Sequence, residues 1–465
     1  MKLHRFIIWI LSFAIFTFFV SSELMAESPV TFSGYLRIRT YATGGYFGRP
    51  GTDTTIKGGD RFAVTRFRVS IVFKPNDNVE VRWRFHAPHG QRWGTSPDQQ
   101  FRSMYMYGII KTDFGNFSIG RISTDIDSAG LQTLGYLPTW GMGSQGYIFD
   151  HDTERDGFIY RNDWDNGFGL KIFYSKFNSF NPVATAFNPK DADYDRYSVE
   201  PYYKWDTGGV SFAVQYDRNM SNTALNTSTT ITNPAKNYFF SINPAFIQKW
   251  SIGQDLSLTL NAEAKYSTGK YKTDIAPGAP SIKQDGFGAY VDLTLGYKSG
   301  TSTLAGWYFD GNGEKQRTAG TTDFTTDPHR HTLVQPGQAF YPFVVFYQNH
   351  TPPAYRLNQW GALEQPNHWA LAIMGNHKLT ENITLNYGIA DFRRSRGAQL
   401  TNGTKISKHL GTEFDVGIVI KFLKTVQFSS KIGIFDNGPY YKERFLDDNY
   451  SGTTWAWGNE LLFNF

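Results

Sequence analysis

The sequence predicts an all-β protein, namely a single transmembrane antiparallel β-barrel of eighteen strands, with sixteen as the alternative. Three observations predict it. Apolar and polar residues alternate in stretches of about eight to twelve residues that recur from Val30 to the last residue. The connections between these stretches are alternately short and long, as in outer-membrane barrels. The chain is also rich in aromatic residues, with 39 Phe, 27 Tyr and 12 Trp.

The N-terminus has the pattern of a secretory signal peptide. Lys2, His4 and Arg5 precede an apolar run over 6–20, and Ala26 follows. This run is shorter than the roughly 20 residues that a membrane-spanning helix needs. We therefore expect residues 1–26 to be removed, with a cut near Ser22 as the alternative, and residues 27–465 to form the barrel.

Residues 79–86 show the strand pattern most clearly, because one face is apolar and the other charged. The apolar face carries Val79, Val81, Trp83 and Phe85, and the polar face carries Glu80, Arg82, Arg84 and His86. Residues 255–266 and 411–422 repeat this alternation. A soluble β-sandwich would alternate as well, so the pattern of connections separates the two fold classes.

The predicted strands follow one another along the whole chain. They are 30–41, 61–73, 79–86, 103–112, 116–121, 156–163, 168–175, 196–205, 210–217, 238–249, 255–266, 286–297, 301–309, 367–377, 383–391, 411–422, 425–434 and 453–465. Every second connection is short, and most of these contain Asn, Asp, Gly or Pro, as tight turns do. The others are much longer, and the longest is an outer loop over 310–366. An even number of strands places both ends on the periplasmic side.

The final strand and the overall composition further restrict the class of protein to which this chain can belong. Trp457, Leu461 and Phe465 share one face of an amphipathic strand that stops on an aromatic residue. Such a strand resembles the signature by which the outer-membrane assembly machinery recognises its substrates. The chain has no Cys, which excludes disulfides, and its net charge of +5 argues against a nucleic-acid partner. We expect outer-membrane lipid and lipopolysaccharide as its surroundings.

Residues 103–130, SMYMYGIIKTDFGNFSIGRISTDIDSAG, resemble a segment of the general bacterial porin family, in which Phe-Gly and Gly-Arg stand at this separation. The resemblance implies an outer-membrane porin that transports ions and small solutes, and a homotrimer. It also implies that Arg121 lies on the pore wall and that loop 122–154 folds inward. Simple alternation instead places Arg121 on the face of Phe117 and Ile119, which a bulge or a face turned toward a neighbouring subunit would reconcile. The sequence does not distinguish a subunit-facing apolar band from a lipid-facing one.

A second, shorter resemblance lies near the C-terminus. Residues 408–441, KHLGTEFDVGIVIKFLKTVQFSSKIGIFDNGPYY, are similar to the closing hairpin of the alginate-export family. That family also uses eighteen strands. The similarity implies an alternative function, a substrate-selective channel or exporter for an anionic saccharide.

The candidate site is the pore wall, where basic and acidic side chains are expected to face each other. The first three predicted strands carry Arg37, Arg39, Arg66, Arg68, Arg82 and Arg84, which we call the basic ladder; Arg121 and Lys171 are further basic candidates. The inward loop supplies Asp125, Asp127, Asp150, Asp152 and Glu154. Guanidinium groups stay charged and bind carboxylate or phosphate, so the basic ladder predicts a preference for anions. Alternatively, these are ordinary wall residues that pair with Glu80 and other carboxylates.

The sequence thus predicts a passive diffusion channel for small hydrophilic solutes, with the saccharide channel and an outer-membrane adhesin or structural barrel as alternatives. We expect no enzyme activity, because none of the ten His residues has a nucleophile-and-base context. We also expect no cofactor or metal. Asp327, His329 and His331 lie close in sequence, but adjacent residues of an extended chain point apart.

Overall fold

The structure is a computed structural model. It describes residues 30–44, 46–48, 55–57, 61–93, 102–123, 154–179, 193–219, 236–272, 282–310, 314–317, 329–330, 343, 367–400, 403–445 and 452–465. The predicted signal peptide lies outside the described residues, so its prediction is untested.

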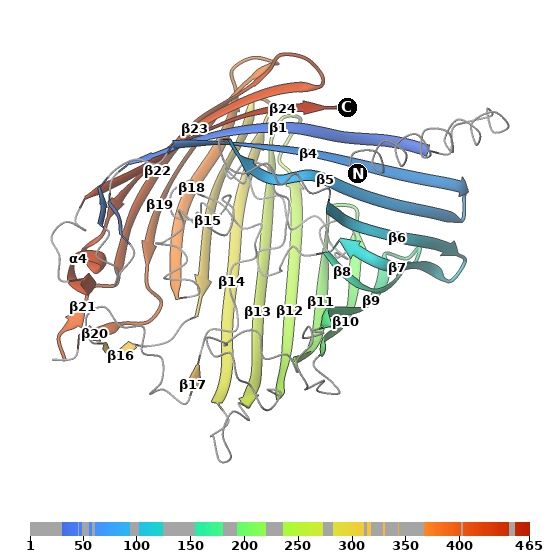
Figure 1. Ribbon diagram of the computed structural model, residues 1–465, viewed down its shortest axis with the longest axis horizontal. Helices are drawn as coiled ribbons and strands as arrows, with labels where there is room; N and C mark the ends of the chain where they lie inside the picture. The colour runs from blue at the N-terminus through green and yellow to red at the C-terminus, as the bar shows by residue number, and fades with distance from the viewer. Residues whose placement is uncertain are drawn as a thin grey trace, which may run out of the picture.

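Eighteen antiparallel strands form one closed barrel (Figure 1). In order around the barrel they are β1 (Val30–Gly44), β4 (Arg61–Asn76), β5 (Val79–Arg92), β6 (Arg102–Thr112), β7 (Gly115–Ser123), β8 (Glu154–Asp163), β9 (Phe168–Ser179), β10 (Asp193–Trp205), β11 (Gly208–Asn219), β12 (Lys236–Ser251), β13 (Ser257–Lys272), β14 (Ile282–Tyr297), β15 (Gly300–Phe309), β18 (His368–Lys378), β19 (Ile383–Arg393), β22 (His409–Lys421), β23 (Val426–Asn437) and β24 (Thr453–Asn464). The first and last strands pair with each other, which removes all open edges. The predicted fold class and strand count are confirmed.

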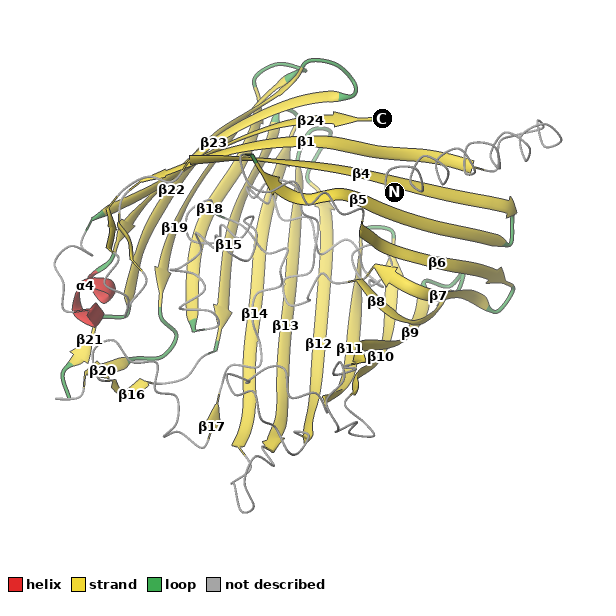
Figure 2. Cartoon of the chain, in the orientation of Figure 1, coloured by secondary structure: helices red, strands yellow, loops and turns green. Residues whose placement is uncertain are grey.

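Short turns gather at one end of the barrel and long connections at the other. The described chain begins at Val30 and ends at Phe465, both at the turn end. The long-connection end carries a helix, α4 (Pro439–Phe445), and a small sheet of β16 (Glu314–Arg317), β20 (Ala398–Leu400) and β21 (Lys405–Ile406) (Figure 2). The hairpin of β2 (Tyr46–Gly48) and β3 (Thr55–Lys57), and β17 (His329–Arg330), which pairs with β14, complete the elements. Within the described residues, no helix is long and apolar enough to cross a bilayer.

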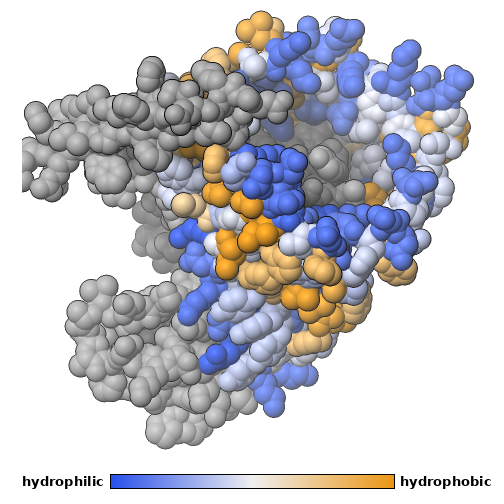
Figure 3. Space-filling model, turned by 90° about the vertical axis from the view of Figure 1, so that its right-hand side faces the viewer, coloured by the Kyte–Doolittle hydropathy of each residue, from blue (hydrophilic) through white to orange (hydrophobic). Residues whose placement is uncertain are grey.

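Every second side chain of a strand points outward. In these strands the outward side chains are mostly apolar, so the outward face of the barrel is apolar. On β13 and the turn before it, this face carries Leu256, Leu258, Leu260, Ala262, Ala264 and Tyr266. Ten residue steps at about 3.4 Å each, tilted by about 40°, span about 26 Å, which is the height of the apolar band of a transmembrane barrel. On the side shown in Figure 3, apolar residues gather in patches bordered by hydrophilic ones.

Aromatic side chains mark both edges of this apolar band. Near the turn end, ring centroids are 4.7 Å apart between Phe168 and Tyr203, and 5.8 Å between Tyr203 and Trp205. Toward the other end, the outward rings of Tyr174, Tyr197, Tyr216 and Tyr238 form a row across β9–β12, with neighbouring centroids 5.2–6.3 Å apart. Two such girdles are what a barrel needs at the two membrane interfaces.

Candidate functional site

All six residues of the basic ladder lie on the inner face, on β1, β4 and β5. Arg37 is opposite Arg66 and Tyr35 is opposite Arg68 in the β1–β4 register, and opposite residues share a face. Arg68 is opposite His86 on β5, which places the even-numbered side chains of β5 on the same inner face. Arg37 and Arg39 are buried, and the other four are half-buried.

Three members of the basic ladder pair with carboxylates. Arg39 Nε lies 2.6 Å from Glu460 Oε2 on β24, and Arg37 Nε lies 3.8 Å from the same oxygen. Arg82 pairs with Glu80 on its own strand. The predicted alternative, in which wall arginines pair with carboxylates, therefore holds for half of the ladder.

The other three arginines have no carboxylate partner among the described residues. Arg84 donates from Nε to Ser70 Oγ at 2.9 Å and lies 4.8 Å over the ring of Tyr105. Arg68 lies 5.7 Å over the ring of Tyr35. Arg66 Nε is buried without a hydrogen-bond acceptor. Among the described side chains of these strands and β24, the six guanidinium groups of the basic ladder face two carboxylates, so this part of the wall keeps a surplus of positive charge.

An acidic pair lies on the opposite wall. Glu263 on β13 is opposite Tyr290 in register, and Asp292 on β14 shares that inner face. Asp292 accepts hydrogen bonds from Asn261 Nδ2 at 3.0 Å and from Tyr290 Oη at 2.9 Å. Strands β13 and β14 stand nine places from β4 and β5 in the eighteen-strand order, so the carboxylates and the basic ladder face each other across the barrel.

The structure places Arg121 on the outward face, which corrects its assignment to the pore wall. Arg121 is opposite Met106 on β6 and Asp156 on β8, and all three side chains are exposed. No bulge interrupts the β6–β7 register, so the alternation shared with Ile119 decides the face. Lys171 does lie on the inner face, buried, with Nζ 3.8 Å from Glu200 Oε2.

The acidic loop cannot be placed. Asp125, Asp127, Asp150 and Asp152 lie outside the described residues, and Glu154 is described only as the first residue of β8, paired with Ser123. Ile122, where the predicted loop begins, is 1% exposed within an inner apolar cluster that includes Tyr107 and Ile159.

Aromatic side chains fill the barrel beside β14–β23. The cluster includes Tyr290, Trp307, Phe309, Phe392, Phe435, Tyr440 and Tyr441, of which the last two come from α4. Phe343, from the predicted outer loop 310–366, is 1% exposed and packs edge-on against Phe392 at 5.8 Å between centroids. Arg394 is also buried, donates a hydrogen bond to Tyr440 Oη and lies 4.9 Å over its ring. This packing leaves the wall of the basic ladder clear of the described cluster.

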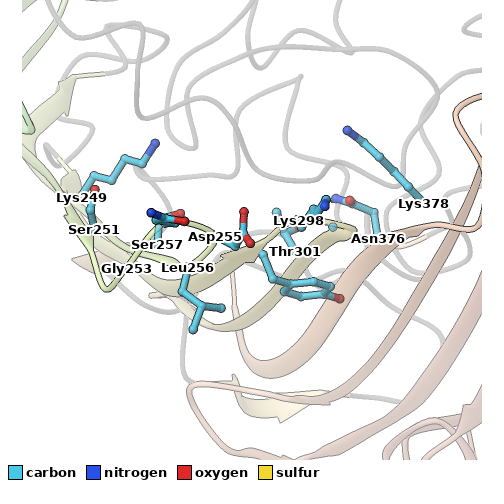
Figure 4. A pocket seen from close by; sticks show the side chains of 14 residues that line it. Lys249, Ser251, Gly253, Asp255, Leu256, Ser257, Lys298, Thr301, Asn376 and Lys378 are labelled. Carbon is cyan, nitrogen blue, oxygen red and sulfur yellow. The ribbon is translucent and has the colours of Figure 1, made fainter.

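A hollow of about 500 Å³ lies at the turn end of β12–β18. Its lining includes Ser257, Thr301 and Asn376, which follow one another across paired strands. Figure 4 shows Lys249 and Lys378 on opposite sides of it, with Lys298 between them. Asp255 also lines the hollow, so the three lysines leave this end of the barrel with a surplus of positive charge.

Sequence reasoning missed the acidic wall and the aromatic filling. The alternation over 255–266 does place Glu263 on the polar face, but nothing in one strand's sequence says which strands stand opposite it. The aromatic residues of the cluster come from four strands, β14, β15, β19 and β23, from helix α4 and from Phe343, so no local pattern reveals it.

Comparisons with known proteins give a likeness in fold alone. No family model matches the chain, and no curated protein matches it. Among solved structures, the outer membrane protein OprD from Pseudomonas aeruginosa has a TM-score of 0.51 at 10% identity, covering 94% of each chain. OccK5 of the same species has a TM-score of 0.49 at 9% identity, covering 93% of this chain and 97% of its own. OmpT of Vibrio cholerae has a TM-score of 0.43 at 13% identity, covering 96% and 100%. The likeness to OprD establishes a shared fold and agrees with the predicted β-barrel architecture.

Proposed function

We propose that this protein is an outer-membrane porin, a passive diffusion channel for small hydrophilic solutes that favours anions. The observation that carries the proposal is the inner wall of β1, β4, β5 and β24, where the six described guanidinium groups of the basic ladder meet two carboxylates, Glu80 and Glu460. Charge of one sign along a confined lumen raises the local concentration of the opposite ion.

The acidic pair on β13 and β14 supports a second element of selectivity. Arginines on one wall and carboxylates on the opposite wall set up a field across the lumen. Such a field orients dipolar solutes and disfavours apolar ones. Small polar metabolites with a carboxylate or phosphate are then the solutes expected to pass most readily.

The remaining parts of the proposal come from the sequence. Residues 1–26 direct export, the mature barrel resides in the bacterial outer membrane among lipid and lipopolysaccharide, and three copies assemble. The protein transports solutes without catalysing a reaction. Loop 122–154 narrows the lumen and adds acidic groups to it.

The proposal is tested with the purified mature protein in a planar lipid bilayer. The reversal potential under a tenfold KCl gradient reports which ion passes more easily. An open conductance with a reversal potential toward that of chloride is expected. A preference for cations would contradict the proposed anion selectivity but not the proposal that the protein is a channel. The absence of any conductance would contradict the proposal of a channel.

One observation favours the saccharide channel as a second candidate. Tyr35 and Tyr105 lie under guanidinium groups of the basic ladder, so arginines and aromatic rings alternate on the same wall. Aromatic rings offer apolar surface to a sugar, while the arginines hold its carboxylates. Saturable block of the conductance by an oligouronate, absent with a neutral oligosaccharide of equal length, would distinguish this candidate from the general channel.

A further inference from the structure

We propose that the hollow at the turn end of β12–β18 is a binding site for a small anion with several negative groups, such as an oligophosphate. Its volume of about 500 Å³ is within the range of small-molecule sites. The inference adds a ligand site to the proposed channel. It rests on that proposed function only for the orientation that puts the turn end in the periplasm, from which the ligand would arrive.

Basic residues recur at one level around the turn end of the barrel. Each of the eight strands that lead into a turn there has an inward basic residue within two residues of its end. These residues, which we call the basic ring, are Lys74, Lys111, Arg161, Lys204, Lys249, Lys298, Lys378 and Lys421. The two-residue period of a strand gives their face, because Lys249 lies four residues from the buried Ala245 and Lys378 four residues from the buried Met374.

Some members of the basic ring pair with carboxylates, but those at the hollow do not. The pairs are Arg161–Asp163, Lys204–Asp163 and Lys74–Glu80, with N–O distances of 2.7, 3.4 and 3.5 Å. Lys249, Lys298 and Lys378, which line the hollow, are exposed, and their side chains make no hydrogen bond or ion pair with another described residue. Asp255 also lines the hollow without pairing with them. Three ammonium groups against one carboxylate make the hollow attractive to anions.

The spacing of the three lysines favours a ligand with more than one negative group. Neighbouring lysines of the hollow come from β12, β14 and β18, which are two strands apart in the barrel order. With strands about 4.8 Å apart and tilted by about 40°, inward side chains about 12 Å from the axis place neighbouring ammonium groups about 8 Å apart. Each ammonium group binds phosphate as a point charge. A chain of phosphate groups can contact two of them at once, whereas orthophosphate contacts only one.

Uncharged donors lie between the lysines, and a glycine keeps the hollow open (Figure 4). Ser257 and Thr301 offer hydroxyl groups. Asn376 donates from Nδ2 to Thr301 Oγ1 at 2.7 Å, so the Thr301 hydroxyl keeps its own hydrogen for a ligand. A Cβ at Gly296 would lie 2.6 Å from Ser257 Oγ, so any larger residue there would crowd this hydroxyl.

The test is isothermal titration calorimetry of the purified protein in a non-ionic detergent, with inorganic tripolyphosphate as the probe. Orthophosphate is expected to bind at least tenfold more weakly than tripolyphosphate. The triple variant Lys249→Gln, Lys298→Gln and Lys378→Gln is expected to weaken tripolyphosphate binding at least tenfold. The matched control removes three lysines of the basic ring that do not line the hollow, by Lys74→Gln, Lys111→Gln and Lys421→Gln. It should change the affinity less than about threefold.

Resistance of the unheated band to SDS shows that each variant has folded. Three results would overturn the inference: no binding of tripolyphosphate by the folded protein, equal affinities for tripolyphosphate and orthophosphate, or equal weakening in the two triple variants. The last result would mean that the whole ring attracts anions without a defined site. Calorimetry requires no open pore, so a barrel that binds tripolyphosphate in this way but conducts no ions would support the inference and contradict the proposed channel.

Discussion

The surplus charge of the basic ladder predicts a measurable change in ion selectivity when its unpaired members are neutralised. The triple variant Arg66→Gln, Arg68→Gln and Arg84→Gln removes the three guanidinium groups that have no carboxylate partner among the described residues. Glutamine keeps most of the side-chain volume and its hydrogen-bonding ability. The variant therefore changes the charge of the wall more than its shape.

The size of the effect follows from the barrel geometry. Eighteen strands about 4.8 Å apart and tilted by about 40° give a radius of about 18 Å, so a guanidinium reaching inward lies about 11 Å from the axis. In water one such charge changes the energy of an ion on the axis by about 0.4 kcal/mol, and screening in 0.1 M salt reduces this about threefold. Each charge lowers the energy of an anion on the axis and raises that of a cation by the same amount. Removing three charges therefore changes the energy difference between anion and cation by about 0.8 kcal/mol, which corresponds to a factor of about four in the permeability ratio.

The assay is the reversal potential of single channels in a KCl gradient around 0.1 M. The chloride-to-potassium permeability ratio is expected to fall about fourfold in the triple variant. It should change little in 1 M salt, because the Debye length is then only about 3 Å. Arg121→Gln, which removes a charge from the outward face, is the matched control and should leave the ratio unchanged. An unaltered ratio in the triple variant at 0.1 M would show that ions do not pass along this wall.

Three further predictions concern stability. Glu460→Gln leaves Arg37 and Arg39 without their shared carboxylate and should lower the free energy of unfolding in vesicles by about 3–5 kcal/mol, far more than the surface-pair variant Asp163→Asn. Gly120→Ala should lower the free energy of unfolding by about 1–3 kcal/mol, because Gly120 has a φ of +131° and a Cβ there would clash with the β6 backbone. Gly108→Ala is the control, because a Cβ at Gly108 meets open space. Equal refolding yields of the two variants would refute this prediction. Phe343→Ala removes a buried ring from the aromatic cluster, so limited proteolysis should cut connection 310–366 faster than in the wild type, and an unchanged rate would mean that this ring does not hold the connection.

Glu80, Arg82 and Arg84 show most clearly what could be predicted from the sequence. Their alternation with apolar residues is local, because successive side chains of a strand point to opposite faces, so the inner face was predictable one strand at a time. The same rule correctly placed Arg121 with Ile119, and the family resemblance that moved it to the pore wall was wrong. Strand count and the short turns were predictable for the same reason.

The sequence by itself therefore determined the barrel fold, the end of the barrel at which the short turns lie, and the inner and outer faces of the strands. Each of these depends on a period of two residues or on the length of the connections. Tertiary structure decided which strands stand opposite one another, and so placed Glu263 and Asp292 across from the basic ladder. It also decided which arginines are neutralised. Arg39 and Glu460 are 421 residues apart in sequence and meet only because β1 and β24 close the barrel. Charge pairing across a closed ring depends on distances in space, which no local sequence pattern contains.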